Sequence, residues 1–270
     1  MKSRFLEYIS LAAALFGTAT LSAAASSPSA TSAPSTPSAA AGLSAPSAPP
    51  APFAVVELFT SEGCSSCPPA DRLLSELAAE AEASGKPVFT LSFHVDYWNH
   101  LGWTDPFSRP EFTERQQRYA QILDGRVYTP QMIVNGGDPF VGSQTGTARR
   151  SIGNALEQSA GAAIALRPAR KDGGLTVEYA VTGHREGDIL NLAIVEKGVS
   201  VPVKRGENGG RTLKHENVVR AFRTVRLDAG GGGSAGLAAP ASVLGGRISL
   251  IAYVQKSGTL RTIGAARAAF

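Results

Sequence analysis

The chain contains two cysteines, Cys64 and Cys67, and only two serines separate them. The apolar, β-prone run at residues 53–60 precedes this pair, and leucines and alanines at helical spacing follow it over residues 70–83. Pro68 fits the first turn of that helix, where the N–H that proline lacks has no helical partner. The sequence therefore predicts a buried strand, a CxxC pair and a helix in direct succession, and this order restricts the possible folds.

Three kinds of chemistry fit the cysteine pair. In a redox centre, the helix N-terminus favours the Cys64 thiolate, and Cys67 lies close enough to resolve a mixed disulfide. As a structural bridge, a disulfide that closes so small a loop would stabilise the folded protein by only roughly 2 kcal/mol. In a metal site, His94 or His100 would have to join the cysteines, because the sequence has no further cysteine pair. We favour the redox centre, keep the other two as alternatives, and predict no metal and no dissociable cofactor.

The run of predicted elements continues to residue 160. Strands are predicted at residues 88–95, 127–134 and 140–142, and helices at residues 111–123 and 147–158. With the first strand and helix, the order is β-α-β-α-β-β-α, in which the third strand runs antiparallel to the first two. The start of that strand, marked by Thr129-Pro130, therefore lies at the CxxC end. A cis-proline there would hold the backbone open beside the disulfide and offer edge groups to a peptide.

The loop after the second predicted strand is rich in aromatic and polar side chains. Parallel strands end at the same sheet edge, so we expect His94, Trp98, His100 and Trp103 near the disulfide, where they would bind substrate together with Thr129. A histidine there could move a proton or stabilise a thiolate. The aromatic rings could bind unfolded chain or shield the sulfurs. The alternative for each residue is a local structural role in anchoring the loop.

The order of strand, CxxC, helix, strand, helix and Thr-Pro-strand resembles the thioredoxin superfamily. More narrowly, the chain resembles a family of secreted bacterial thioredoxin-like proteins of unknown function that carry a C-terminal β domain. The segments that carry this resemblance are VVELFTSEGCSSCPPAD (residues 55–71), YTPQ (128–131), GENGGRTL (206–213) and NVVR (217–220).

The superfamily resemblance implies roles for four residues. Cys64 would attack a substrate disulfide, Cys67 would resolve the mixed disulfide, and Pro130 in the cis form would help to bind substrate. Glu57 would take the place of the buried acid that assists proton transfer at the second cysteine, and Gly63 stands where a tryptophan usually precedes the motif. The implied function is an exported thiol–disulfide oxidoreductase that acts on a protein or a small thiol or disulfide. The alternative is a non-catalytic thioredoxin-like binding module with a structural disulfide.

From residue 161 the pattern changes to short strand-like runs separated by turn residues. We therefore predict an α/β thioredoxin-like domain at residues 53–160, followed by an antiparallel, sandwich-like β domain at residues 161–270. The glycines and Asn208 of the segment at residues 206–213 suit close contact, and one possibility is that this segment reaches over the face of the thioredoxin-like domain. A nearby set of basic residues could bind an acidic partner or form a solvated face: Arg205, Arg211, Lys214, His215 and Arg220.

The N-terminal segment predicts export. Residues 1–25 combine Lys2 and Arg4 with a short apolar run and small residues, as in a cleavable signal peptide. Residues 26–52 are almost wholly Ala, Ser, Pro and Thr, which predicts a disordered linker. We expect a periplasmic or secreted protein without stable membrane insertion after signal cleavage. The net charge is +4 and no basic block is interleaved with aromatic residues, so nucleic acid is not a predicted partner.

Overall fold

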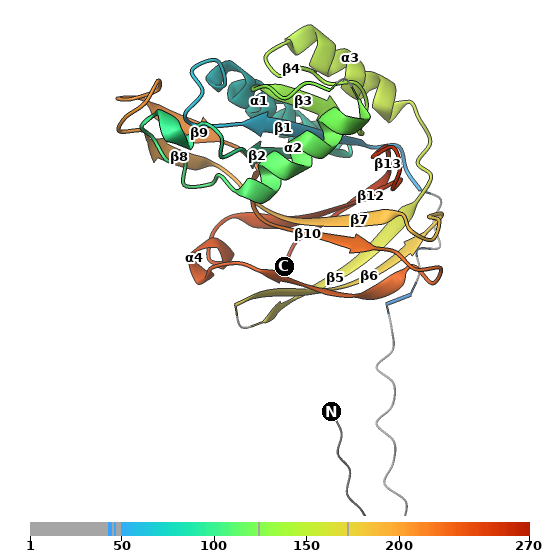
Figure 1. Ribbon diagram of the computed structural model, residues 1–270. Coiled ribbons are helices and arrows are strands. Elements are labelled where there is room, and N and C mark those ends of the chain that lie inside the picture. Colours follow the sequence, from blue (N-terminus) through green and yellow to red (C-terminus); the bar gives the residue numbers. More distant parts are fainter. Residues whose placement is uncertain (1–42, 45, 47–49, 124, 172) are drawn as a thin grey trace, which may run out of the picture. The chain divides into compact units, whose positions relative to one another are not determined.

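The computed structural model describes residues 43, 44, 46, 50–123, 125–171 and 173–270. The predicted signal peptide at residues 1–25 and most of the predicted linker at residues 26–52 lie outside these residues. The described residues belong to one compact unit, a mixed α/β structure (Figure 1). No helix within them is long and apolar enough to cross a membrane.

A large mixed sheet runs through this unit (Figure 1). Its eight described strands follow the order β13-β12-β7-β10-β2-β1-β3-β4. β2 pairs in parallel with both β1 and β10, and the other neighbours are antiparallel. The bounds are β1 (Ala54–Thr60), β2 (Val88–His94), β3 (Gln131–Val134), β4 (Phe140–Val141), β7 (Ile189–Glu196), β10 (Val218–Arg226), β12 (Ile248–Gln255) and β13 (Thr262–Ala268).

Helices cover both faces of β1 and β2, which explains why every residue of these two strands is buried. On one face, α1 (Pro68–Ser84) and α3 (Thr145–Leu156) pack against alternate β1 residues such as Val56 and Leu58. On the other face, α2 (Pro110–Ile122) packs against residues such as Phe59. The chain leaves α1 at Gly85, whose φ of 65° is a left-handed conformation that favours glycine.

A second sheet packs against the C-terminal strands of the first. It has the order β11-β6-β5, with β5 (Ala163–Lys171), β6 (Gly174–Thr182) and β11 (Gly232–Ala238). Its apolar side chains, including Val177 and Leu237, share a core with Leu192 of β7 and Leu250 of β12. A separate hairpin of β8 (Val199–Pro202) and β9 (Thr212–His215) lies beside α1, and two short helical turns, η1 (Asn99–Leu101) and α4 (Ala241–Leu244), complete the described elements.

The element order from β1 to α3 matches the predicted β-α-β-α-β-β-α order. The boundary predicted at residues 160 and 161 falls between α3 and β5, but it does not divide the main sheet. Val218 of β10 pairs with Ser92 of β2, so the later strands continue the sheet that the earlier strands begin. A strand such as β2 would otherwise expose an unpaired edge, and hydrophobic periodicity does not reveal which strand covers it.

Candidate functional site

The two cysteines form a disulfide at the start of α1. Cys67 is the N-cap residue of α1, and its carbonyl accepts hydrogen bonds from the backbone N–H groups of Ala70 and Asp71. Both cysteines are 0% exposed, whereas Ser65 and Ser66 between them are exposed. The loop therefore presents its serines to solvent and keeps its sulfurs inside the protein.

A segment from the C-terminal half of the chain covers this loop. We call residues 203–211, which connect β8 to β9, the strap. The Asn208 side-chain amide is fully buried, and its Nδ2 donates hydrogen bonds of 2.9 Å to the carbonyl oxygens of both Glu62 and Cys64. The Ser65 N–H donates to Glu207 Oε2 at 2.9 Å. The segment at residues 206–213 therefore reaches over the earlier part of the chain, and the structure places this contact at the CxxC, where Asn208 attaches the strap.

Trp103 lies between the strap and the residues just before Cys64. Its indole Nε1 donates to Glu62 Oε2 at 2.7 Å. A Cβ placed on Gly206 would lie 3.1 Å from the Trp103 Cβ, so the strap backbone runs directly against the base of the Trp103 side chain. The φ of Gly206 is 77°, which also favours glycine at this position. The structure thus brings Trp103 to the CxxC, as the sequence predicted.

The Thr129–Pro130 peptide bond is cis and lies at the same sheet edge. The Trp98 indole Nε1 donates to Thr129 Oγ1 at 2.8 Å, and the Trp98 Cβ lies 3.0 Å from the place of a Cβ on Gly63. The side chain of Trp98 therefore spans from the residue before Cys64 to the residue before Pro130. The absence of a side chain at position 63 is what leaves room for Trp98.

Pro130 also approaches the first turn of α1. A Cβ placed on Gly142 would lie 3.3 Å from the Pro130 Cβ and 3.1 Å from the Ala70 Cβ. The Gly142 N–H donates to the Pro130 carbonyl at 2.9 Å. The cysteine loop, the proline turn and Trp98 therefore converge at one edge of the sheet.

His94 ends β2 in a buried ion pair. Its Nδ1 lies 2.7 Å from Asp105 Oδ2, and both side chains are almost wholly buried. Burial lowers the pKa of His94, but the charge and hydrogen bond of Asp105 outweigh it, so the His94 pKa is raised. Burial raises the pKa of Asp105, and His94 with two backbone N–H donors outweighs that effect, so the Asp105 pKa is lowered. A raised pKa for His94 and a lowered pKa for Asp105 both favour the charged forms of the two side chains.

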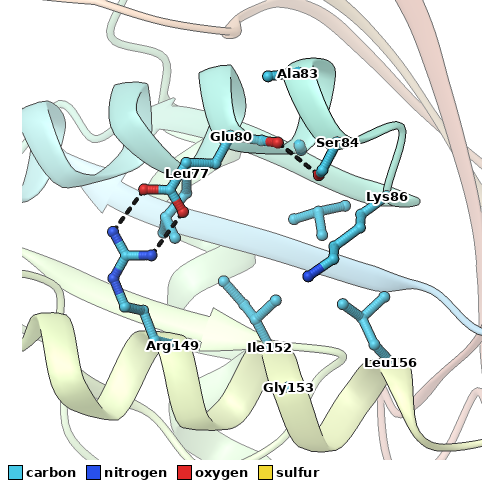
Figure 2. Close-up of a pocket in the computed structure, with 11 residues that line it drawn as sticks. Leu77, Glu80, Ala83, Ser84, Lys86, Arg149, Ile152, Gly153 and Leu156 are labelled. Atoms are coloured by element: carbon cyan, nitrogen blue, oxygen red, sulfur yellow. Dashed lines mark hydrogen bonds and ion pairs between the residues drawn. The ribbon is translucent and has the colours of Figure 1, made fainter.

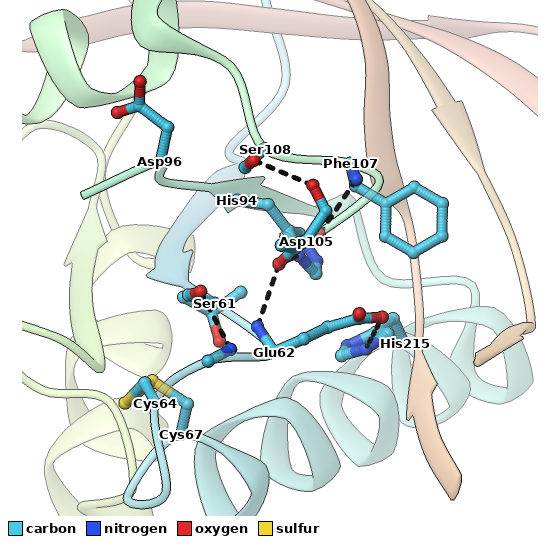
Figure 3. A network of polar contacts seen from close by, with 12 residues as sticks. Ser61, Glu62, Cys64, Cys67, His94, Asp96, Asp105, Phe107, Ser108 and His215 are labelled. Atoms are coloured by element: carbon cyan, nitrogen blue, oxygen red, sulfur yellow. Dashed lines mark hydrogen bonds and ion pairs between the residues drawn. A yellow bond between two sulfur atoms is a disulfide. The ribbon is translucent and has the colours of Figure 1, made fainter. Parts of the chain in front are cut away.

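Further carboxyl and imidazole side chains lie around this pair, on the inner side of the cysteine loop (Figure 3). His215 of β9 lies with its Nε2 3.4 Å from Glu62 Oε1 and its Nδ1 3.8 Å from Asp71 Oδ2. The His94 and His215 rings meet edge to face, with centroids 4.7 Å apart. Burial raises the pKa of Asp71, against the charges of both histidines and a hydrogen bond from Thr60.

Several atoms of this buried cluster have no hydrogen-bond partner among the described residues. They are Glu62 Oε1, His94 Nε2 and both ring nitrogens of His215. Unsatisfied buried polar atoms are rare in proteins, and their concentration here marks the region under the CxxC as specialised. No group of three or more His, Cys, Asp or Glu side chains in the described ranges has the arrangement of a metal site.

The sequence analysis did not identify the acids of this cluster. Glu62 stands two residues before Cys64, and Asp71 stands four residues after Cys67, so both flank the motif in the sequence. The carboxyl groups of Glu62 and Asp71, so close to the cysteines, were a signal in the sequence for acidic residues at the site. Asp105 reaches the site only through the tertiary fold and had no local signal, whereas Asn208 among its glycines suited a close-contact loop whose place the sequence could not give.

Two predicted site residues, Glu57 and His100, are not part of the buried cluster at the CxxC. Glu57 is on the α2 face of β1, opposite α1, where its carboxylate forms a buried bidentate pair with Arg115 at 2.6 and 2.9 Å. The Tyr119 hydroxyl donates to the same carboxylate at 2.6 Å. These partners, and not the cysteines, surround Glu57. His100 is exposed on η1.

A cavity away from this site lies between the C-terminal half of α1 and α3 (Figure 2). It has a volume of about 480 Å³ and an apolar wall that includes Leu77, Ile152 and Leu156. The exposed ion pair of Glu80 with Arg149, joined at 2.6 Å, stands at its side. At 1.5 Å per residue, the cavity begins roughly 15 Å along α1 from Cys67, so it is separate from the disulfide site.

The fold and site define a mixed α/β protein with a buried disulfide that begins a helix and is covered by a strap of the same chain. The chain belongs to the family described as "Protein of unknown function (DUF1223)", whose model matches residues 55–255. The search of curated proteins gave no significant match.

Two solved structures are similar to this chain. A crystal structure of a protein from Agrobacterium tumefaciens shares 32% sequence identity over 82% of this chain and 95% of that chain, with a TM-score of 0.60. HBP35 of Porphyromonas gingivalis shares 16% identity over 81% of this chain and 75% of that chain, with a TM-score of 0.57. The second similarity concerns the fold alone.

Proposed function

We propose that this protein is an exported thiol–disulfide oxidoreductase with a thioredoxin-like N-terminal part, and that Cys64 and Cys67 are its redox pair. The observation that carries this proposal is the convergence of the Cys64–Cys67 disulfide at the α1 N-terminus with the cis Thr129–Pro130 turn. The Trp98 side chain bridges the two, through Gly63 and Thr129.

The proposed reaction is a two-step exchange. In the reduced protein, the Cys64 thiolate attacks a substrate disulfide, which forms a mixed disulfide and releases one substrate thiol. The Cys67 thiolate then attacks the Cys64 sulfur, which re-forms the protein disulfide and releases the second substrate thiol. Two electrons pass from the protein dithiol to the substrate disulfide, and the reverse sequence oxidises a substrate dithiol.

The α1 N-terminus supports thiolate chemistry at this place. Unpaired backbone N–H groups and the positive end of the helix dipole stabilise a nearby anion. Pro68 and Pro69 carry no N–H, and the N–H groups of Cys64 and Cys67 donate to the carbonyls of Ser61 and Cys64, so the support for a thiolate comes from the helix dipole. The buried sulfurs require that the strap moves before a substrate reaches them, because Asn208 and Glu207 hold the loop.

The test is equilibration of the protein with reduced and oxidised glutathione, followed by trapping of free thiols. We expect a reversible dithiol–disulfide equilibrium and exchange with a disulfide substrate. The Cys64→Ser variant, which keeps one thiol, is the control. Exchange by the wild-type protein that is no faster than exchange by Cys64→Ser rejects the proposal.

One observation favours a second candidate function, a binding module with a structural disulfide. Both cysteines are 0% exposed beneath the strap. A purely structural bridge would resist reduction until the protein unfolds. Reduction of the disulfide under native conditions, with retained near-ultraviolet circular dichroism, would contradict this candidate and support the redox function.

A further inference from the structure

Beside the start of α1 lies a small cavity with an unusual concentration of positive charge. Its volume is about 180 Å³, and Arg72, Arg211 and Lys214 line it together with Pro68 and Asp71. Pro68 directly follows Cys67. The cavity is therefore next to the disulfide loop, between the first turn of α1 and the end of the strap with β9.

Two of the three cations are free to meet a ligand. Arg72 and Lys214 are exposed, and neither side chain forms a hydrogen bond or ion pair with another residue in the described part of the chain. Arg211 is fixed at the site, because its Nη1 donates to Asn208 Oδ1 at 2.8 Å. Asn208 in turn donates to the Cys64 carbonyl, so the guanidinium is two hydrogen bonds away from the reactive loop.

The acids nearby do not neutralise this charge. Asp71 is 4% exposed, its Oδ1 accepts a hydrogen bond from Thr60, and its Oδ2 faces His215 in the interior. Glu207 on the strap is an exposed carboxylate that accepts the Ser65 N–H, and among the described residues it forms no ion pair with these cations. The strap adds two more exposed cations, Lys204 and Arg205. The solvent side of the CxxC loop is thus predominantly positive.

We propose that Arg72, Arg211 and Lys214 form an anion subsite that selects disulfide and thiol substrates carrying a carboxylate near the reacting sulfur. The inference rests on the proposed redox function and names its substrate class. Guanidinium groups bind carboxylates by paired hydrogen bonds, and a cavity of this size holds one such group, not a large ligand. A substrate carboxylate seated there would hold its sulfur beside the Cys64–Cys67 loop.

The test compares three small disulfides of different charge as oxidants of the reduced protein: anionic glutathione disulfide, neutral hydroxyethyl disulfide and cationic cystamine. Each consumes the protein dithiol and yields the protein disulfide with two small thiols. Each rate is divided by the rate of dithiothreitol with the same disulfide, which removes differences in leaving-group reactivity. At about 0.01 M salt we expect glutathione disulfide to be favoured over hydroxyethyl disulfide by roughly 10-fold, and cystamine to be disfavoured.

The variant Arg72→Glu/Lys214→Glu should abolish this preference or reverse it. The control Lys171→Glu/Lys256→Glu changes the net charge equally at exposed positions on β5 and after β12, and should keep the preference. Equal normalised rates for the three disulfides, or equal effects of the two variants, would overturn the subsite.

A second measurement separates the subsite from the redox function. S-methylglutathione carries the carboxylates but cannot exchange, and its binding to the oxidised protein can be measured by calorimetry. Binding that the Arg72→Glu/Lys214→Glu variant loses and the control retains supports the subsite even if no exchange is detected. Absence of exchange with all three disulfides overturns the proposed function, whereas absence of S-methylglutathione binding overturns the subsite.

Discussion

Removal of the Asn208 amide should make the disulfide easier to reduce. In the Asn208→Ala variant the strap loses its two hydrogen bonds to the Glu62 and Cys64 carbonyls. A hydrogen bond between uncharged groups contributes about 1 kcal/mol, so opening of the strap should become about 2 kcal/mol more favourable. Because about 1.4 kcal/mol corresponds to a factor of ten, the open population should rise roughly 30-fold.

The rate of reduction reports that population if a reductant reaches the sulfurs only in the open state. The assay mixes the native protein with a phosphine reductant and counts free thiols over time by alkylation and mass spectrometry. We expect the rate for Asn208→Ala to exceed the wild-type rate roughly 30-fold, as the population does. Lys204→Ala, an exposed position of the same strap, is the matched control and should leave the rate unchanged.

Two results would refute this reasoning. A rate change below about threefold would mean that the strap is not the barrier to the sulfurs. An equal acceleration by Lys204→Ala would mean that general loosening of the strap, and not the Asn208 amide, controls access. Denaturant unfolding of each variant, measured alongside, shows whether a faster reduction comes from global unfolding instead.

Further predictions concern the two buried ion pairs. Arg115→Met should destabilise the protein by about 3–5 kcal/mol, because it leaves the Glu57 carboxylate buried and unpaired. The double variant Arg115→Met/Glu57→Gln should regain part of that loss in denaturant unfolding. The pKa of His94 is raised above 6.5 in the folded state, so its stabilising effect is full below about pH 6.5 and is lost as the pH rises through the folded value. The stability difference between wild type and His94→Gln should therefore shrink on raising the pH. A constant difference would contradict the charged pair with Asp105.

Much of the first half of the fold could be predicted from local pattern. The apolar run of β1, the prolines at the start of α1 and the left-handed glycine at its end are features of neighbouring residues. The convergence of Pro130 with the CxxC was also predictable. In the predicted order of elements, β3 runs antiparallel to β1, and its start then falls at the end of β1 where the cysteines lie.

Other features of the fold and the site depend on long-range contacts, which the pattern of neighbouring residues does not reveal. Glu57 was assigned to the place of the buried acid near the second cysteine by resemblance, yet strand alternation turns it to the α2 face, where Arg115 pairs with it. Arg115 lies 58 residues further along the chain, so the sequence near the motif could not show this pairing. The side of a strand on which a charged residue lies follows from its register, and one position of difference moves it to the opposite face.

The strap is the clearest case, and it changes what the later part of the chain does. Asn208 is 144 residues from Cys64, and the same stretch of chain supplies His215 to the buried cluster before it continues into β10. β10 pairs with β2, the strand that ends at His94. The residues after position 161 therefore complete the sheet edge, the buried acid–imidazole cluster and the cover of the disulfide. Access to the sulfurs is consequently a property of both halves of the chain, because Asn208 and Glu207 of the strap bind the CxxC loop that the first half supplies.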